Sequence, residues 1–401
     1  MANDFSASFK EVLAKKQETV FYKNNVAMAL VDVSYNQEMS SGDTLTRTYR
    51  QDVGDPDTYS PGTDITIDEF TDTPETLTVN GKFAKGFYVD DFDKIQNLYD
   101  AARNYGKDVA EKMSNKIDAD ILGEIQNALS TIDDGSIGGT SGNGITVTTS
   151  NILKIVTAAK KKLTQQDVPL NNVYMTVSPE FEEVLTQYVA GRDTMMGDDV
   201  NKNGFIGKFL GTDFYRTNQS LGSAVLSLAT NPTDGDTITI EGIVLTFVSS
   251  IGTTAGNVLI GINVDTTRAN LAGLINAPKT TSATQVALST ANARKFLNYS
   301  ATNSNSADTL TVKVKGVGVL TVSETLVDAT DTWTTAKIKQ HLHLGIKEAI
   351  TLVMQKDPSI KIQEAQKRFG NYVLDGMLYG YKTFADGAKQ LVNIELNASA
   401  F

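Results

Sequence analysis

The chain has 401 residues, with 36 Lys and Arg against 47 Asp and Glu, a net charge of −11, no cysteine and two histidines. Lack of cysteine excludes disulfides, thiolate nucleophiles and Cys-ligated metal sites. The acidic balance argues against nucleic-acid binding as the main activity, because phosphate contacts need clustered Lys and Arg. No apolar run approaches the ~18 residues of a membrane span, and no signal-peptide pattern is present at the start. We therefore expect two or three domains, folded in a reducing cytoplasm.

Residues 40–89 are predicted to be extended. Thr44, Thr46 and Thr48 alternate with larger side chains, and turns around Pro56 and Pro61 interrupt the run. Strand character then resumes before residue 89. A segment of this composition cannot bury a core of its own, so it is either a loose hairpin or an arm that lies on another chain.

The longest regular pattern follows this segment. Apolar residues recur at steps of three and four from Phe92 to Leu129, which predicts one helix over 92–129. Asp90, Asp91 and Asp93 lie at its start, where carboxylates can accept free N–H groups and suit the helix dipole. A catalytic or Mg²⁺-binding cluster is the alternative interpretation of these acids.

Shorter elements are predicted after the long helix. Residues 152–163 form an amphipathic helix that Ser150 would cap, and residues 173–177 form a strand. Ser178 and Pro179 then mark a helix start, and Gly191 marks its end. Near the end of the chain, alternating apolar residues at 392, 394 and 396 predict a final strand.

Residues 221–335 differ in composition from the rest of the chain. They hold 14 charged residues among 115, against 69 among the other 286, and they hold 22 threonines. Glu241 and Gly242 separate two β-rich runs as a hairpin turn, and a helix over 265–277 could begin at Asp265. Two further strands are expected at 309–315 and 317–322. The pattern predicts an inserted, β-rich domain with one helix that folds as a unit.

Two polar motifs have side chains that could bind a metal ion. Asp199, Asn201 and Asn203 have the acceptor spacing of an EF-hand calcium loop, but Leu210 stands where the bidentate glutamate belongs. A polar surface turn is the favoured interpretation. His341 and His343 would face the same side of a strand. They lack a third histidine, so a pair of strand histidines at an interface is favoured over a metal site.

The other motifs indicate no catalytic or cofactor site either. Lys160, Lys161 and Lys162 would end a helix, where cations suit its dipole, and nucleic-acid contact is the less favoured interpretation. The glycine-rich run 138–142 lacks the ending of a P-loop and the strand–turn–helix context of a nucleophile elbow. We therefore predict no catalytic residues, no cofactor and no enzyme.

The order of these elements resembles the major capsid proteins of tailed bacteriophages, which have the HK97-like fold. Residues 42–44 and the extended segment after them look like the E-loop of that family. Residues 87–94, leading to 115–122, look like its spine helix, and residues 173–181 look like the strand and helix of its peripheral domain. Residues 206–218 resemble the run into its axial domain, and 344–350 and 369–381 resemble its final strands.

The resemblance implies an α+β fold with five parts. These are an N-terminal arm (1–39), an E-loop (40–89), a peripheral domain (90–190) with spine helix 92–129, an axial domain (191–220 and 336–401), and an insertion domain (221–335). The insertion domain is similar in position to the extra domain of P22-like coat proteins.

The resemblance also implies a function. The chain would assemble as hexamers and pentamers into an icosahedral or prolate shell around double-stranded DNA, which it would contact non-specifically, with no membrane involved. A separate scaffolding protein, a portal and a decoration protein are the implied partners. Assembly would occur in the host cytoplasm, and the chain would end in the virion. The candidate subunit-interface residues are Arg47, Arg50, Lys82, Lys85, Asp90 and Asp91.

Arg47 and Arg50 are expected to pair with acids of the next subunit. Two other functions remain open from the sequence. One is an encapsulin-like compartment for enzyme cargo, which shares the fold. The other is a glycan-binding adhesin that uses the Thr-rich insert, although this would require secretion.

Overall fold

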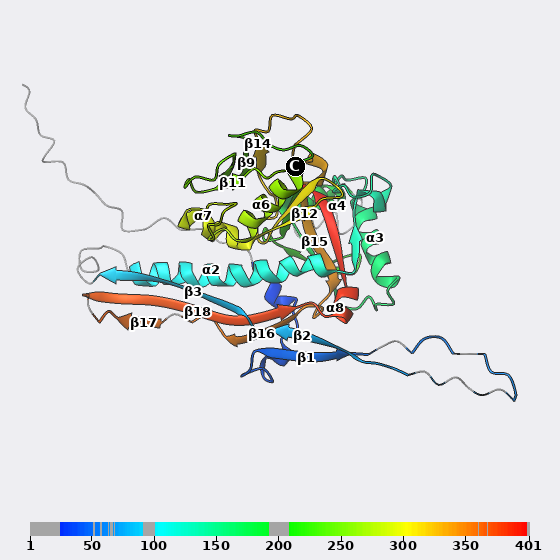
Figure 1. The fold of residues 1–401 in the computed structure, drawn as a ribbon. Helices are drawn as coiled ribbons and strands as arrows, with labels where there is room; N and C mark the ends of the chain where they lie inside the picture. Colours follow the sequence, from blue (N-terminus) through cyan, green and yellow to red (C-terminus); the bar gives the residue numbers. More distant parts are fainter. Residues whose placement is uncertain are drawn as a thin grey trace, which may run out of the picture.

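A computed structural model describes residues 25–50, 53–56, 58–62, 64, 67, 69–90, 101–191, 208–359, 361–366 and 368–398. Figure 1 shows a long helix, α2, that runs between two layers: a β-rich lobe above it and a narrow sheet below it. A hairpin made of β1 and β2 lies below the narrow sheet and projects away from the body. Within the described residues, no helix is long and apolar enough to cross a membrane.

The described α-helices are α2 (Ala101–Gly123), α3 (Ile152–Thr164), α4 (Pro179–Ala190), α6 (Val264–Asn276), α7 (Thr290–Lys295) and α8 (Ala385–Lys389). Six short 3₁₀ turns accompany them: η2 (Ala27–Ala29), η3 (Ser34–Asn36), η4 (Glu124–Asn127), η5 (Asp134–Ile137), η6 (Phe296–Asn298) and η7 (Thr335–Lys337).

Nine strands form the central sheet, which has the order β12-β13-β8-β15-β5-β7-β6, with β19 paired to β15 and to β4. They are β4 (Ser130–Ile132), β5 (Val173–Val177), β6 (Lys208–Phe209), β7 (Thr212–Arg216), β8 (Leu221–Ser227), β12 (Tyr299–Ser304), β13 (Thr309–Val314), β15 (Lys339–Ile346) and β19 (Leu391–Asn397). Helices α3 and α4 bury their apolar faces against it, with Ile155, Val156, Phe181 and Leu185 inaccessible or nearly so.

The predicted strand 173–177 and the helix start at Ser178 are confirmed, because the Ser178 side chain accepts a hydrogen bond from the Phe181 N–H. Ser150 does not cap α3. The capping position belongs to Asn151, and the Ser150 hydroxyl bonds the Thr148 hydroxyl instead.

The long helix ends earlier than the apolar spacing predicts. Residues 92–100 lie outside the described residues, and α2 ends at Gly123. Ile125 remains buried because the chain continues as the 3₁₀ turn η4, which keeps the spacing of three. The Leu129 N–H then bonds the Ala388 carbonyl at 2.9 Å, and β4 starts at the next residue.

The segment 221–335 has its own core but is not detached from the body. Its strands β9 (Thr237–Ile240), β10 (Ile243–Val248), β11 (Asn257–Leu259) and β14 (Val322–Glu324) form a separate sheet in the order β11-β10-β9-β14. The Glu241–Gly242 turn is confirmed, with positive φ of 49° and 73°. However, β8, β12 and β13 extend the central sheet, since β8 pairs with β15.

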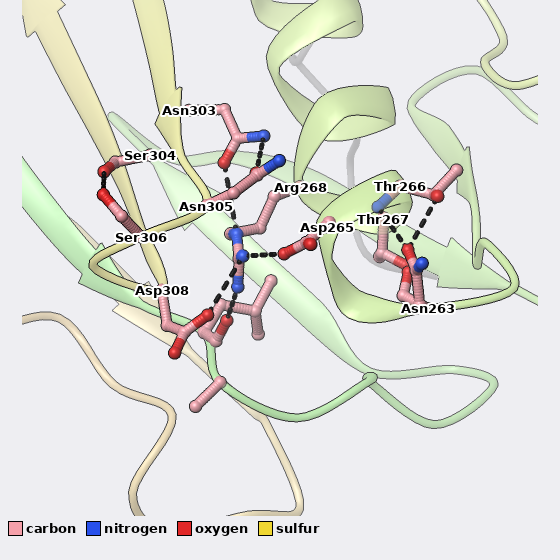
Figure 2. Close-up of polar contacts among 12 residues, drawn as sticks. Asn263, Asp265, Thr266, Thr267, Arg268, Asn303, Ser304, Asn305, Ser306 and Asp308 are labelled. Atoms are coloured by element: carbon pink, nitrogen blue, oxygen red, sulfur yellow. Dashed lines mark hydrogen bonds and ion pairs between the residues drawn. The ribbon is translucent and has the colours of Figure 1, made fainter.

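Three local predictions in this segment were wrong. It contains two helices, α6 and α7, rather than one. The cap of α6 is Asn263, which accepts the Thr266 N–H at 2.9 Å, and Asp265 pairs with Arg268 instead (Figure 2). The second late strand is only β14, because residues 317–321 do not join a sheet.

A fully buried Arg268 guanidinium links α6 to the strands beside it. Figure 2 shows it between Asp265, Asp308 and Asn303, with Nε 3.1 Å from Asn303 Oδ1 and one terminal nitrogen 3.1 Å from Asp308 Oδ1. It also donates to the Leu228 carbonyl. A buried charge with this many acceptors fixes the helix in one position on the sheet.

The sheet below α2 is called the finger sheet here. It consists of β16 (Thr351–Lys356), β18 (Gly370–Lys382), β17 (Lys361–Glu364) and β3 (Gly81–Asp90), all antiparallel to β18. One face packs on α2, where Phe83 stacks on Tyr379 at 5.8 Å between ring centroids. The Tyr379 hydroxyl donates to Asp120 of α2 at 2.6 Å.

Three buried carboxylates connect α2 to the surrounding chain. Asp118 accepts the Val26 and Ala27 N–H groups at 2.8 and 2.6 Å, and the Gln219 side chain at 3.0 Å. Asp120 accepts from Lys116 and Tyr379, and Lys315 lies 3.6 Å away. Glu124 accepts the backbone N–H and hydroxyl of Thr383, both at 3.2 Å.

The turn after β13 lies directly on α2. A Cβ placed on Gly316, which has a φ of +79°, would lie 2.8 Å from the Ala119 Cβ. A Cβ on Gly123 would lie 2.8 Å from the Lys315 Cδ. Gly316 therefore has no space for a side chain and a φ that favours glycine, and Gly123 leaves the space that the Lys315 side chain fills.

We predict that Asp118→Ala lowers the free energy of unfolding by about 3 kcal/mol, since the buried Val26 and Ala27 N–H groups lose their acceptor and Gln219 loses one of its acceptors. Urea unfolding at neutral pH measures the change. The control is Glu364→Ala on an exposed strand, expected to change stability by less than about 0.5 kcal/mol. Equal unfolding midpoints for the two variants would show that Asp118 does not anchor residues 26 and 27.

Candidate subunit-interface surfaces

The hairpin is firmly attached at its root. Strands β1 (Thr44–Tyr49) and β2 (Thr73–Thr78) pair in antiparallel register, from Thr44 opposite Thr78 to Tyr49 opposite Thr73. A small core of Met39, Leu77, Val79, Val353 and Phe384 buries the root against β16 and the residues before α8. The Lys382 ammonium also donates to the Thr76 carbonyl at 2.9 Å.

Arg47 belongs to this root rather than to an open surface. Its guanidinium pairs with Asp386 of the same chain and lies 4.9 Å from the centre of the Phe384 ring. The expected pairing with an acid of the next subunit would therefore compete with an existing ion pair. Arg50 is exposed at the end of β1.

The hairpin beyond the root has an unusual composition. Residues 51–72, called the tip loop here, contain seven Asp and Glu and no Lys or Arg. Four apolar side chains in it, Val53, Tyr59, Ile67 and Phe70, are each more than half exposed. Water-exposed apolar groups in a strongly acidic segment are typical of a segment that binds elsewhere.

The finger sheet has an open face opposite α2, called the outer face here. Alternation along the strands and the register across them place the following residues on it: Lys82, Ala84, Gly86, Tyr88, Asp90, Lys356, Lys361, Gln363, Tyr372, Leu374, Gly376 and Leu378. Lys356 reaches across it, because its Nζ lies 3.3 Å from where a Gly376 Cβ would be. Arg368 adds a cation 5.9 Å from the Tyr88 ring centre. This stretch is basic and partly apolar.

The other predicted interface residues lie around this sheet. Lys85 is exposed on the opposite side of β3 from Lys82. Asp90 ends β3, and one of its carboxylate oxygens lies 3.1 Å from the Tyr88 hydroxyl. Asp91 and Asp93 lie outside the described residues, so the helix cap stays a prediction.

The histidine pair is buried in the central sheet, so the interface interpretation was wrong. His341 Nε2 lies 2.8 Å from the Ser223 hydroxyl, and its Nδ1 lies 3.1 Å from Asn393 Oδ1. His343 Nε2 donates to the Leu122 carbonyl of α2 at 2.7 Å, and its Nδ1 has no hydrogen-bond partner among the described residues. Burial lowers the pKa of both imidazoles from 6.5 to about 4.

The remaining motifs support no chemistry in the described residues. The Asp133 and Asp134 carboxylates hold the glycine-rich loop by accepting the Gly142 and Thr140 N–H groups at 2.6 and 2.8 Å. Lys160 donates to the Leu210 carbonyl. The EF-hand-like residues Asp199, Asn201 and Asn203 lie outside the described residues. The described part of the chain holds no group of three or more metal-binding side chains.

The sequence analysis missed two features of these surfaces. Lys356 and Lys361 are far from Lys82 in sequence, and only the pairing of β16, β17 and β3 with β18 brings them together. The acidic tip loop, in contrast, is visible in the sequence as 22 residues with seven carboxylates and no cation. A charge count over a short window would have found it.

Residues 74–250 match a protein-family model described as phage capsid protein. A search of curated proteins finds no match. Solved structures match over nearly the whole chain at low identity. The structure titled Mycobacterium phage Che8 is 14% identical, with a TM-score of 0.59, and the match covers 98% of each chain.

Two cyanophage capsids give similar results. The capsid of cyanophage P-SCSP1u is 13% identical, with a TM-score of 0.55 over 98% of this chain and 94% of that one. The capsid of cyanophage Pam1 is 11% identical, with a TM-score of 0.52 over 99% of each chain. These likenesses confirm the expected α+β, HK97-like fold.

We predict that the buried histidines make stability depend on pH. Their pKa values are lower in the folded chain than in the unfolded chain, so the unfolded state binds more protons between pH 6.5 and 4. Stability should be constant above pH 6.5 and fall below it, by up to about 1.4 kcal/mol per pH unit for each histidine. Urea unfolding from pH 4 to 8 measures this dependence.

His343→Gln is the matched variant, because an amide can donate to the Leu122 carbonyl without titrating. It should lose part of the slope between pH 4 and 6.5. An unchanged slope would assign the dependence to other groups.

Proposed function

We propose that this chain, a phage major capsid protein with the HK97-like fold, closes its shell by laying the tip loop of one subunit on the outer face of a neighbour's finger sheet. The observation that carries the proposal is the opposite composition of the two surfaces. One has seven carboxylates and no cation, and the other presents Lys82, Lys356 and Lys361 around apolar side chains.

The position of the hairpin supports contact with a second subunit. Its root is buried, but the part beyond β1 and β2 projects away from the body in Figure 1. Its apolar side chains Val53, Tyr59 and Ile67 therefore gain burial only on another chain. A neighbour that covers them removes apolar area from water and pairs their carboxylates with lysines.

The outer face is suited to receive such a segment. Tyr372 and Leu374 are more than a third exposed, and Gly86 and Gly376 leave space that the Leu374 and Lys356 side chains cover. Lysines around an apolar surface form the polar rim of an interface and select an acidic partner. Because these charges remain near water, each pair adds little affinity and mainly fixes the register.

Higher assembly and partners extend this proposal. Contacts between the tip loop and the outer face would join subunits into hexamers and pentamers that enclose double-stranded DNA. A separate scaffolding protein and a portal would take part, and assembly would occur in the host cytoplasm. A net charge of −11 supports a shell that contacts packaged DNA only non-specifically, because like charges repel at long range.

The domain division also remains a proposal. It comprises a peripheral domain over 90–190 with the long helix, an axial domain over 191–220 and 336–401, and an insertion domain over 221–335. A continuous core of residues from Ala224 to Ile338 supports the insertion as a unit. Its sheet continues the axial sheet through β8, so the boundary crosses a sheet instead of a linker.

We predict that charge reversal at either surface lowers the yield of closed particles. Asp64→Lys with Glu69→Lys, or Lys82→Glu with Lys361→Glu, should reduce it about tenfold or more at low salt, because like charges then face each other. A chain with all four changes should regain assembly, since both surfaces are reversed together. Sedimentation separates closed particles from free subunits, and electron microscopy counts the closed particles.

The control for the face variant is Lys85→Glu, on the same strand but the opposite side. The control for the tip variant is Glu183→Lys on α4. Both should assemble as the unchanged chain does. If the chain with all four substitutions stays unassembled while circular dichroism shows that it is folded, the tip loop does not bind the outer face.

A further inference from the structure

A cleft of about 320 Å³ lies between α2 and residues 294–298 of the insertion domain, and Phe83 of the finger sheet also lines it. Its polar lining consists of Lys112, Asn115, Lys116, Gln219, Arg294 and Asn298. The side chains come from three places in the fold: α2, the start of β8, and the α7–η6 turn. The cleft therefore exists only because the insertion domain lies on α2.

The lining has three cations and no acid, in a chain whose net charge is −11. Two buried carboxylates of α2 contact this lining. Asp118 accepts the Gln219 side chain at 3.0 Å, and Asp120 Oδ1 lies 2.8 Å from Lys116 Nζ. The lining cations that these contacts leave are Lys112 and Arg294. The cleft thus concentrates positive charge within an acidic protein.

Two of the three cations are available for a ligand. Lys116 is engaged, because its Nζ lies 2.8 Å from Asp120 Oδ1 and 2.7 Å from Asn298 Oδ1. Lys112 and Arg294 are exposed, and neither has an ion-pair partner among the described residues. They stand on the two walls, one on α2 and the other on α7.

The rest of the lining suits a peptide chain. Asn115 and Asn298 present carboxamides, which can both donate to and accept from a peptide backbone, whereas the Gln219 amide is buried and bonds Asn25 and Asp118. Phe83 and the half-exposed Leu297 provide apolar contact. Duplex DNA carries its phosphates on a broad outer surface, which does not fit a cleft of this size.

We propose that this cleft binds an acidic peptide segment of a partner protein, with carboxylates paired to Lys112 and Arg294. An apolar side chain of the peptide contacts Phe83 and Leu297, and its backbone bonds the carboxamides. Because the two cations belong to α2 and to the insertion domain, the bound peptide bridges these parts.

The test uses the full-length, unassembled chain and a fluorescein-labelled hexapeptide, Glu-Leu-Glu-Asp-Phe-Glu, followed by fluorescence anisotropy at low salt. Lys112→Gln with Arg294→Gln should weaken binding about tenfold or more, since two charge-assisted contacts are lost. The matched control is Lys107→Gln with Lys295→Gln, which makes the same charge change on the same two helices outside the cleft lining. This control should bind as the unchanged chain does.

Three results would overturn the proposal. The unchanged chain could fail to bind the peptide, or both double variants could weaken binding equally, which would show a diffuse charge effect. A labelled 12-base-pair DNA duplex could also bind more tightly than the peptide and lose affinity in the Lys112 and Arg294 variant alone, which would assign the cleft to nucleic acid. Thermal melting confirms that each variant is folded.

Discussion

Burial of three carboxylates, Asp118 and Asp120 on α2 and Glu124 in the turn η4 that follows it, is the constraint on which this subunit depends. A carboxylate out of water must be matched by donors. The donors come from residues 26 and 27, from Gln219 and from Thr383. These buried carboxylates therefore bond different parts of the chain at one place. Those parts meet around α2, which makes the helix the centre of the molecule.

The same separation of charge explains why the folded subunit is incomplete on its own. Internal charges are matched within the chain, as with Arg268 and the carboxylates of α2. The tip loop and the outer face instead keep opposite charges apart in one subunit, together with apolar side chains that remain in water. Under the proposed contact, such a molecule gains stability from its own copies, which is the property that a shell requires.

How much of this could be predicted depends on how local the cause is. The Glu241–Gly242 turn and the Ser178 cap depend on neighbouring residues, and the sequence analysis found both. Three other features depend on segments that are distant in sequence, so no local pattern predicts them. They are the end of α2 at Gly123, the burial of His343 and the pairing of Arg47 with Asp386. The order of elements was sufficient to predict the fold. The residues of the outer face could be identified only from the strand register in the structure.

The close approach of Gly316 and Ala119 has a mechanical consequence. A turn of the segment 221–335 lies on α2 with no space for one added carbon, so sliding along the helix would bring Gly316 and Ala119 into a clash. The Lys315 side chain fills the space over Gly123 beside it. We therefore expect this turn and α2 to move together when the subunit changes shape.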